Sequence, residues 1–439
     1  MKIFSSVLFI ALLIIGFGFF AKNIKKLIRN IQLGRDVDRT DNASERWMTM
    51  ARVALGQGKM TVRPIAGILH IIVYLGFIII NIELLEIIID GIFGTHRVFS
   101  FMGGFYDFLI ASFELLAFLV IVSVVVFWIR RNIVRIKRFW NPEMEGFPKN
   151  DANYILYIEF VLMVLFLTMN AADYKLQLMG EYHQAGSFPI SQYIAHLLPE
   201  NSTVLVIIEK AAWWLHIAGI LFFMNYLYYS KHLHILLAFP NTYFSKLEPK
   251  GQLTNLESVT KEVKMMMDPN ADPFAAAPAG EEGSVPEKFG ASDATDLNWV
   301  QLMNAYTCTE CGRCTSVCPA NITGKKLSPR KIMMDTRDRI EEIGKNVDQN
   351  GEFKPDNKQL LGDYISHEEL WACTSCNACV DACPVLIDPL SIIVDLRRFL
   401  VMEQSAAPQE LNIMMTNIEN NSAPWQFGQA DRLNWKDEA

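Results

Sequence analysis

The chain has 439 residues, of which 51% are hydrophobic and 20% are charged, with a formal net charge of −7. This composition is too apolar for an ordinary soluble protein and too charged for a chain that lies in a membrane throughout. It predicts a membrane part joined to a soluble part, and no basic stripe indicates a nucleic-acid partner.

Five apolar runs come close to or exceed the length of about 20 residues that a bilayer requires. They lie near residues 3–21, 64–90, 102–129, 152–172 and 204–238. The first run lacks a small-residue cleavage site and is followed by the basic segment KNIKKLIRN, so we expect it to stay as a span. The sequence therefore predicts a five-helix transmembrane domain over residues 1–239.

The basic residues predict how these helices are oriented. The loop 22–63 holds ten Lys and Arg residues, and RRNIVRIKRF follows the third run, whereas loop 91–101 has only Arg97 and loop 173–203 only Lys175. Positively charged loops stay on the cytoplasmic side. We expect a bacterial cytoplasmic membrane protein with its N-terminus outside and everything after the fifth span in the cytoplasm.

Histidines in two of the runs predict a haem. If the fifth run is one continuous helix, His216 and His234 share a face and lie about 27 Å apart. The second run carries His70 at the depth of His234, because the two spans run in opposite directions. We predict that His70 and His234 are the axial ligands of one haem, of the non-covalent b type because there is no C-x-x-C-H motif. The alternative is that each histidine simply packs within the bundle.

A second haem at His216 has no matching histidine. The residue one haem spacing further along the second run is Ile80. His216 therefore has a single protein ligand to offer, borrows His183 or His196 from the outer loop, or binds no haem. His232 is expected at the membrane interface, and His96 and His367 have no evident partners.

All eight cysteines fall in two runs, CTECGRCTSVCP and CTSCNACVDACP, and both read C-x2-C-x2-C-x3-C-P. In this spacing three cysteines hold one [4Fe–4S] cluster and the fourth reaches the other cluster. The predicted ligand sets are Cys308, Cys311, Cys314 and Cys383 for one cluster, and Cys373, Cys376, Cys379 and Cys318 for the other. Zinc sites and disulfides are the alternatives, but zinc usually takes separated C-x2-C pairs.

The soluble half is expected to be an α-helical domain with two clusters over residues 299–404. Ser328 and Pro329 can start a helix whose apolar positions are Ile332, Met333, Ile340 and Ile343. Residues 240–298 are expected to contain a linker, because 264–298 are rich in Pro, Ala, Gly and acidic residues. Residues 405–439 form a C-terminal tail whose aromatic residues, Trp425, Phe427 and Trp435, suggest partner docking.

The motifs resemble two known families. AGILH at His70, LH at His216 and SKHLH at His234 are similar to the axial-histidine motifs of the haem b membrane subunits of respiratory nitrate reductase and heterodisulfide reductase. Ile80 departs from the nitrate reductase pattern, in which a second ligand stands there. The run YTCTECGRCTSVCPANITGKKLSPR resembles the subunit of heterodisulfide reductase that holds two clusters.

Fusions of these two parts resemble membrane iron–sulfur oxidoreductases. This resemblance implies an oxidoreductase subunit, active as part of a complex, that passes electrons from electron-transfer flavoprotein or another soluble dehydrogenase to menaquinone. In such proteins cysteine-rich CCG domains follow the cluster domain. We therefore expect a separate CCG-domain protein, like the CCG-containing component of heterodisulfide reductase, to dock on residues 405–439.

Quinone chemistry also needs groups that exchange protons. The spans contain five ionisable residues to consider, Glu83, Glu86, Glu114, Glu159 and Lys210. Because charged groups inside a membrane are usually functional, we predict Glu114 and Lys210 as the catalytic groups of the quinone site. Arg63 and Lys231 could neutralise haem propionates. Two alternative functions are an electron wire between soluble partners without a quinone site, and a membrane-anchored ferredoxin scaffold.

Overall fold

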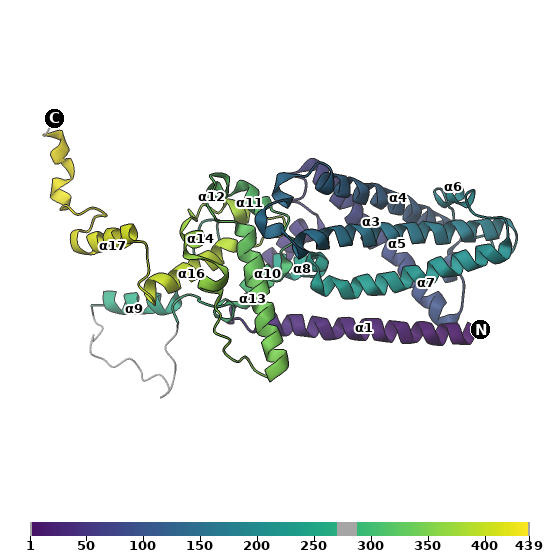
Figure 1. The fold of residues 1–439 in the computed structure, drawn as a ribbon, viewed down its shortest axis with the longest axis horizontal. Coiled ribbons are helices and arrows are strands. Elements are labelled where there is room, and N and C mark those ends of the chain that lie inside the picture. The colour runs from purple at the N-terminus through teal and green to yellow at the C-terminus, as the bar shows by residue number, and fades with distance from the viewer. Residues whose placement is uncertain (1, 270–287, 438–439) are drawn as a thin grey trace.

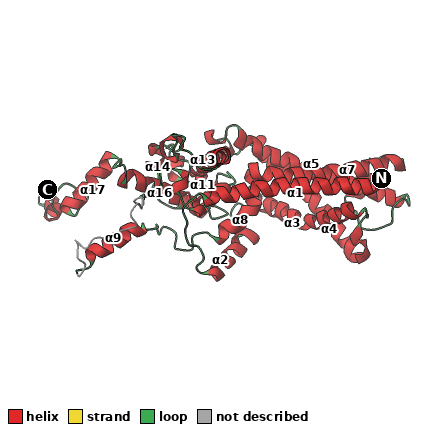
Figure 2. Cartoon of the chain, turned by 90° about the horizontal axis from the view of Figure 1, so that it is seen from below, coloured by secondary structure: helices red, strands yellow, loops and turns green. Residues whose placement is uncertain are grey.

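A computed structural model describes residues 2–269 and 288–437. Over these ranges the regular structure is helical, and the only β-type pairings are the isolated bridges Arg35–Asn298 and Leu361–Ile365. Figure 2 shows helices joined by loops throughout the chain. The predicted all-α fold class is confirmed.

Five helices are long and apolar enough to cross a membrane. They are α1 (Lys2–Gln32), α3 (Pro64–Phe93), α4 (Gly104–Asn132), α5 (Phe147–Leu178) and α7 (Ser202–Tyr226). Each coincides with one of the five predicted spans, so that prediction is confirmed. In Figure 1 they lie side by side along the long axis, with the N-terminus at the end away from the C-terminal half.

The outer surface of this bundle is apolar. On α1 only 11% of the most apolar window is buried, and Ile3, Phe4 and Ile14 are 83%, 75% and 68% exposed. So many exposed apolar side chains are suited to lipid rather than to water. Inside the bundle α3 approaches α4 closely at Gly76, where a Cβ atom would lie 2.6 Å from a methyl carbon of Val120.

Local sequence sets the helix ends. Pro64 starts α3, where its missing N–H costs nothing, and Gly94 ends this helix with a φ of 68°. The Asn201 side chain accepts a hydrogen bond from the Val204 N–H and so caps α7.

The C-terminal half is a set of shorter helices around α13. They are α10 (Trp299–Thr307), α11 (Arg313–Val317), α12 (Pro319–Ile322), α13 (Pro329–Asn350), α14 (His367–Trp371), α15 (Ala378–Ala382) and α16 (Pro389–Met402). The Ser328 side chain caps α13 and Pro329 is its first residue, as predicted. The four predicted apolar positions of α13 are each at most 1% exposed.

The two halves pack directly on each other. Leu27 of α1 and Leu233 lie in the same hydrophobic core as the C-terminal helices. Backbone bonds continue this contact, from the Arg35 N–H to the Leu297 carbonyl (2.8 Å) and from the Trp299 N–H to the Arg35 carbonyl (3.0 Å). Ala291, Ala294 and Leu297, inside the predicted linker 240–298, are at most 1% exposed, so the folded C-terminal half begins before residue 299. Residues 270–287 of that linker lie outside the described residues.

The remaining helices are peripheral. They are α2 (Ala43–Met50), α6 (Ser191–Ala195), α8 (His234–Tyr243), α9 (Glu257–Met267) and α17 (Gln409–Asn421). In both views α17 and the C-terminus extend away from the rest of the protein. Of the predicted tail, residues 438–439 lie outside the described part.

Candidate cluster and haem sites

The two cysteine motifs fold into loops of the same backbone shape. Glu310 and Ser375, at the third position of each motif, have φ of 53° and 54°, and Gly312 and Asn377, at the fifth, have φ of 68° and 59°. Alternating left-handed residues turn successive N–H groups toward one side, which suits the negative sulfurs of a cluster. Each loop continues into a five-residue helix, α11 or α15, that ends at a Cys-Pro pair.

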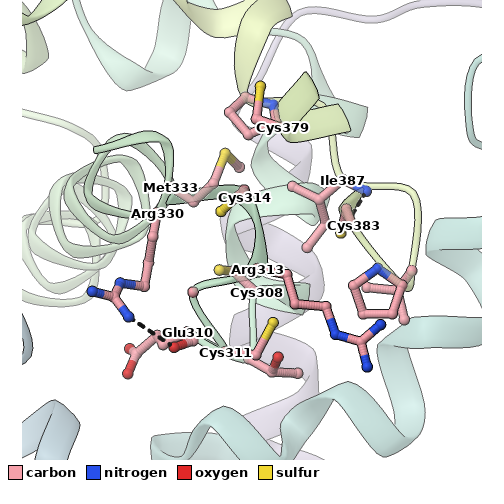
Figure 3. A pocket seen from close by; sticks show the side chains of 15 residues that line it. Cys308, Glu310, Cys311, Arg313, Cys314, Arg330, Met333, Cys379, Cys383 and Ile387 are labelled. Atoms are coloured by element: carbon pink, nitrogen blue, oxygen red, sulfur yellow. Dashed lines mark hydrogen bonds between the residues drawn. The ribbon is translucent and has the colours of Figure 1, made fainter. Parts of the chain in front are cut away.

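The first cysteine group lines a cavity of about 390 Å³. Cys308, Cys311 and Cys314 come from the first motif, and Cys383 comes from the end of the second. Figure 3 shows these four sulfur atoms around one space, with the Cys379 sulfur directed away from it. The Cys383 sulfur also accepts a hydrogen bond from the Ile387 N–H at 3.3 Å.

The second group lines a separate cavity of about 330 Å³. It consists of Cys373, Cys376 and Cys379 from the second motif and Cys318 from the first. Cys376 is exposed, so this cavity lies close to the surface. Each motif thus contributes its last cysteine to the other cavity, which is the crossed grouping that the spacing predicts.

The geometry suits clusters better than the alternatives. All eight cysteines are free of disulfides. A tetrahedral zinc ion would bring its sulfurs within about 3.8 Å of one another, but across residues 2–269 and 288–437 no three Cys, His, Asp or Glu side chains are grouped to hold one ion. Burial raises the pKa of Cys308 to about 12 and that of Cys383 to about 11. Thiolates here therefore need the positive charge of bound metal.

The predicted inner haem ligands lie face to face. The ring centroids of His70 and His234 are 6.3 Å apart. Two imidazoles bound on opposite sides of one metal atom, with bonds of about 2.1 Å, place their centroids roughly 6 to 6.5 Å apart. The His234 Nδ1 lies 3.2 Å from the Lys231 carbonyl oxygen, which leaves Nε2 free, and the His70 Nδ1 is buried without a partner. The residues present fit a haem held by both histidines.

The fifth span is interrupted, so one premise of the sequence argument is wrong. Helix α7 ends at Tyr226, two short 3₁₀ turns follow, and His234 begins the new helix α8. Between the turns Ser230 is extended, with φ −114° and ψ 149°. His216 and His234 are therefore not on one face of a single helix, although His234 still reaches His70.

His216 lies elsewhere, at a cavity within the bundle. Its side chain is 4% exposed, and its Nδ1 lies 3.0 Å from the Leu162 carbonyl oxygen. Ile80 also lines the cavity, whereas neither His183 nor His196 is among its lining residues. The outer loop therefore brings no second histidine to this cavity.

The predicted quinone groups Glu114 and Lys210 lie in different settings. Glu114 is fully buried and accepts hydrogen bonds from the Ile190 and Ser191 N–H groups at 2.9 and 3.0 Å, so it anchors the start of α6. The Lys210 side chain is 54% exposed and pairs with Glu209 at 3.0 Å. The structure does not bring these two residues together, and neither lines the His216 cavity.

The other residues examined in the sequence have definite partners. Lys231 donates to the Glu310 carboxylate, which also accepts from Arg337 at 2.8 Å, and Arg63 donates to the Ser316 hydroxyl at 2.8 Å. Both basic residues thus bind the cluster domain rather than standing free for propionates. His96, which seemed to lack a partner, lies 3.3 Å from Asp173.

The first cavity is the one next to the membrane half. Arg313, in its lining, donates to the Lys59 carbonyl at 3.0 Å. Val385, also in its lining, accepts from the Asn241 side chain at 2.7 Å. These contacts place the cluster site of Cys308, Cys311, Cys314 and Cys383 between the second cavity and the histidine pair.

A buried ion pair that the sequence did not reveal joins the halves. Glu143, between α4 and α5, accepts from Arg330 at 2.6 Å and from the Ser328 hydroxyl at 2.7 Å, and Arg330 is fully buried. Its partners are separated from it by more than 180 residues, so no local pattern could indicate it.

Replacing Glu143 with Gln is expected to destabilise the docking of the two halves by roughly 3 kcal/mol, because it leaves Arg330 buried without a counter-charge. Burial acts to raise the pKa of Glu143, but Ser328 and Arg330 outweigh it and lower the pKa. The stabilisation is therefore complete above the ordinary Glu pKa of about 4.3 and is lost as the pH falls through the lowered value. Thermal unfolding at several pH values measures this, with exposed Glu145→Gln as the control. Equal stability of both variants at neutral pH would contradict it.

Comparison with known proteins supports the cluster site. Residues 307–387 match the 4Fe-4S dicluster domain family. The chain carries a 4Fe–4S dicluster domain. A domain of this kind supports two [4Fe–4S] clusters.

Similar proteins extend the likeness to the membrane half. The chain is 30% identical, over 95% of its length, to the probable iron-sulfur-binding oxidoreductase FadF of Bacillus subtilis, and 26% identical, over 96%, to the EtfAB:quinone oxidoreductase of Syntrophomonas wolfei. These alignments span 58% and 57% of the two relatives. A probable membrane-anchored ferredoxin of Chromohalobacter salexigens is 31% identical over 34% of this chain and 24% of its own length. No solved structure matches.

These similarities establish a coarse identity. The chain is homologous to membrane-anchored iron–sulfur oxidoreductases and to heterodisulfide reductase subunits. Its role is electron transfer, as part of a redox enzyme.

Proposed function

We propose that this chain is the membrane subunit of a quinone-linked oxidoreductase, which carries electrons between a cytoplasmic partner and menaquinone. The observation that supports it most is the 6.3 Å separation of the His70 and His234 rings, next to a domain that holds two clusters. His70 and His234 would hold haem b, which supplies a one-electron carrier inside the membrane.

The contacts suggest an order of carriers. Cys318, Cys373, Cys376 and Cys379 hold the cluster nearer the surface, where a soluble partner reaches it through exposed Cys376. Cys308, Cys311, Cys314 and Cys383 hold the cluster next to the membrane half. Electrons then pass to the inner haem.

This chain of one-electron carriers is suited to a partner that exchanges two electrons. A quinone takes two electrons and two protons, so single-electron carriers connect it to a soluble donor. The printed name of the Syntrophomonas wolfei relative, an EtfAB:quinone oxidoreductase, is consistent with a flavoprotein donor and a quinone acceptor.

A partner protein would dock on the tail. Trp425, Phe427 and Trp435 are 37%, 60% and 69% exposed on the segment that extends from the cluster domain. Aromatic side chains are typical of binding surfaces. We assign this surface to a CCG-domain iron–sulfur protein similar to the CCG-containing component of heterodisulfide reductase, and the cluster domain to the cytoplasmic side of a bacterial membrane.

Reconstitution tests this function. The purified chain is placed in liposomes that contain menaquinone, and the clusters are reduced with dithionite from outside. We expect haem b to become reduced and menaquinol to form. Reduced clusters and haem without menaquinol would instead favour an electron wire that lacks a quinone site.

A further inference from the structure

A second cavity inside the bundle is a candidate ligand site. It measures about 760 Å³ and lies among α3, α4, α5 and α7. Its walls are mostly aliphatic and aromatic, with four polar side chains, Asn81, Glu83, Glu159 and His216. An apolar cavity with a few polar groups is the usual form of a small-molecule site.

Glu83 is the first group that indicates a ligand. Its side chain is 3% exposed, and its Oε2 atom is buried without a hydrogen-bond partner. A buried unpaired polar atom is costly, and an ionisable group inside a membrane usually serves a function. A ligand that hydrogen-bonds to Glu83 would remove this cost.

His216 is the second such group. The Leu162 carbonyl oxygen lies 3.0 Å from its Nδ1 and fixes the ring, so Nε2 is left for a ligand in the cavity. A haem would also accept this nitrogen, but among the lining residues there is no second histidine, and Ile80 offers no ligand atom. The cavity does not fit a haem with two protein ligands.

We propose that this cavity binds the head group of a quinone, with His216 and Glu83 as its hydrogen-bonding partners. This inference rests on the proposed function and locates its substrate. Two electrons arriving singly from the inner haem, together with two protons, convert the two quinone carbonyls into hydroxyls. The oxidation of a quinol is the reverse, and Glu83 and Glu159 are the carboxyl groups that can exchange protons with the ring.

Aromatic side chains connect the cavity with the inner histidine pair. Phe223 lines the cavity, and its ring centroid lies 5.3 Å from that of His232. The His232 ring lies 5.3 Å from His234. A quinone in the cavity is therefore separated from the proposed haem by side chains in contact.

Hydrogen-bonding side chains connect the region of Glu83 with the opposite end of the bundle. One turn further along α3, Glu86 accepts from the Tyr106 hydroxyl at 2.8 Å. Arg97 donates to that hydroxyl at 3.1 Å and to Asp173 at 2.6 Å. His96, whose side chain is 33% exposed, lies 3.3 Å from Asp173. Such a series of polar groups is what proton exchange at a buried site requires.

The test measures binding and haem content separately. The full-length chain is purified in detergent and titrated with the quinol analogue 2-heptyl-4-hydroxyquinoline N-oxide, whose fluorescence is quenched on binding. We expect Glu83→Gln and His216→Leu each to weaken binding about tenfold, the loss expected for one strong hydrogen bond. Haem content, from the pyridine haemochrome, should stay at the wild-type value.

Two further variants guard against misfolding. Ile80→Phe fills the cavity without touching its polar groups and should abolish binding of the analogue. Glu209→Gln changes a buried carboxyl on α7 outside the cavity and should leave binding unchanged.

Two results would overturn the proposal. One is the loss of one of two haems in His216→Leu, which would make the cavity a haem site. The other is wild-type affinity for the analogue in both Glu83→Gln and Ile80→Phe. A wild-type chain without haem would defeat the proposed function instead, and the titration would still decide this site.

Discussion

Replacing His234 with alanine is expected to remove haem b from the protein and to leave about eight iron atoms per chain in the two clusters. The His70 and His234 rings are 6.3 Å apart, so each can supply one axial ligand, and removal of either leaves the metal with one. The cysteines line separate cavities in the C-terminal half, so the clusters should survive. Optical difference spectra and iron analysis measure both effects.

Matched variants define this result. His70→Ala should lose haem in the same way, and His367→Ala, an exposed histidine of the cluster domain, should retain it. In liposomes the two haem-free variants should no longer pass electrons from the clusters to menaquinone. Full haem content in both His70→Ala and His234→Ala would disprove the ligand assignment.

Replacing Cys383 with serine is expected to destroy the cluster of the first motif, although Cys383 belongs to the second. The reason is its position in the cavity of Cys308, Cys311 and Cys314 (Figure 3). About four of the eight iron atoms should be lost. Electron transfer to the haem should also stop, because this cavity lies next to the membrane half.

The crossed arrangement makes the comparison sharp. The paramagnetic resonance spectrum that remains in Cys383→Ser should match that of Cys308→Ser. The spectrum of Cys318→Ser should instead match that of Cys373→Ser. If Cys383→Ser resembled Cys373→Ser, each motif would hold its own cluster and the assignment would be wrong.

Much of the fold could be predicted because its signals are local. Each apolar run fixes a helix of membrane length, and the Ser-Pro pair at 328–329 fixes the start of α13. The spacing of the cysteines constrains both loops, and the repeated positive φ at Glu310 and Ser375 follows from that repeat.

The break after Tyr226 could not be predicted, because it depends on a distant residue. The segment carries no Pro or Gly, and its apolar pattern continues. The break is held by Asp151 of α5, which accepts hydrogen bonds from the Tyr226 hydroxyl at 2.6 Å and from the Lys231 N–H at 3.1 Å. A tertiary contact thus overrides the local preference for a continuous helix.

The roles of buried charges were equally hidden. Glu114 seemed a proton-exchanging group because it lies in a span, yet its carboxylate binds backbone N–H groups of a loop more than 70 residues away. Glu83, one of five similar candidates in the sequence, differs only in that the fold leaves one of its oxygens unpaired beside a cavity. Partners that come together only in the folded chain decide between such residues.

The most direct measurement is the haem content of the purified wild-type chain. A reduced-minus-oxidised spectrum combined with the pyridine haemochrome should show a b-type α-band and one haem per chain, in protein that also contains about eight iron atoms in clusters. A chain with full clusters and no haem band would contradict the account, because His70 and His234 would then face each other without a metal between them.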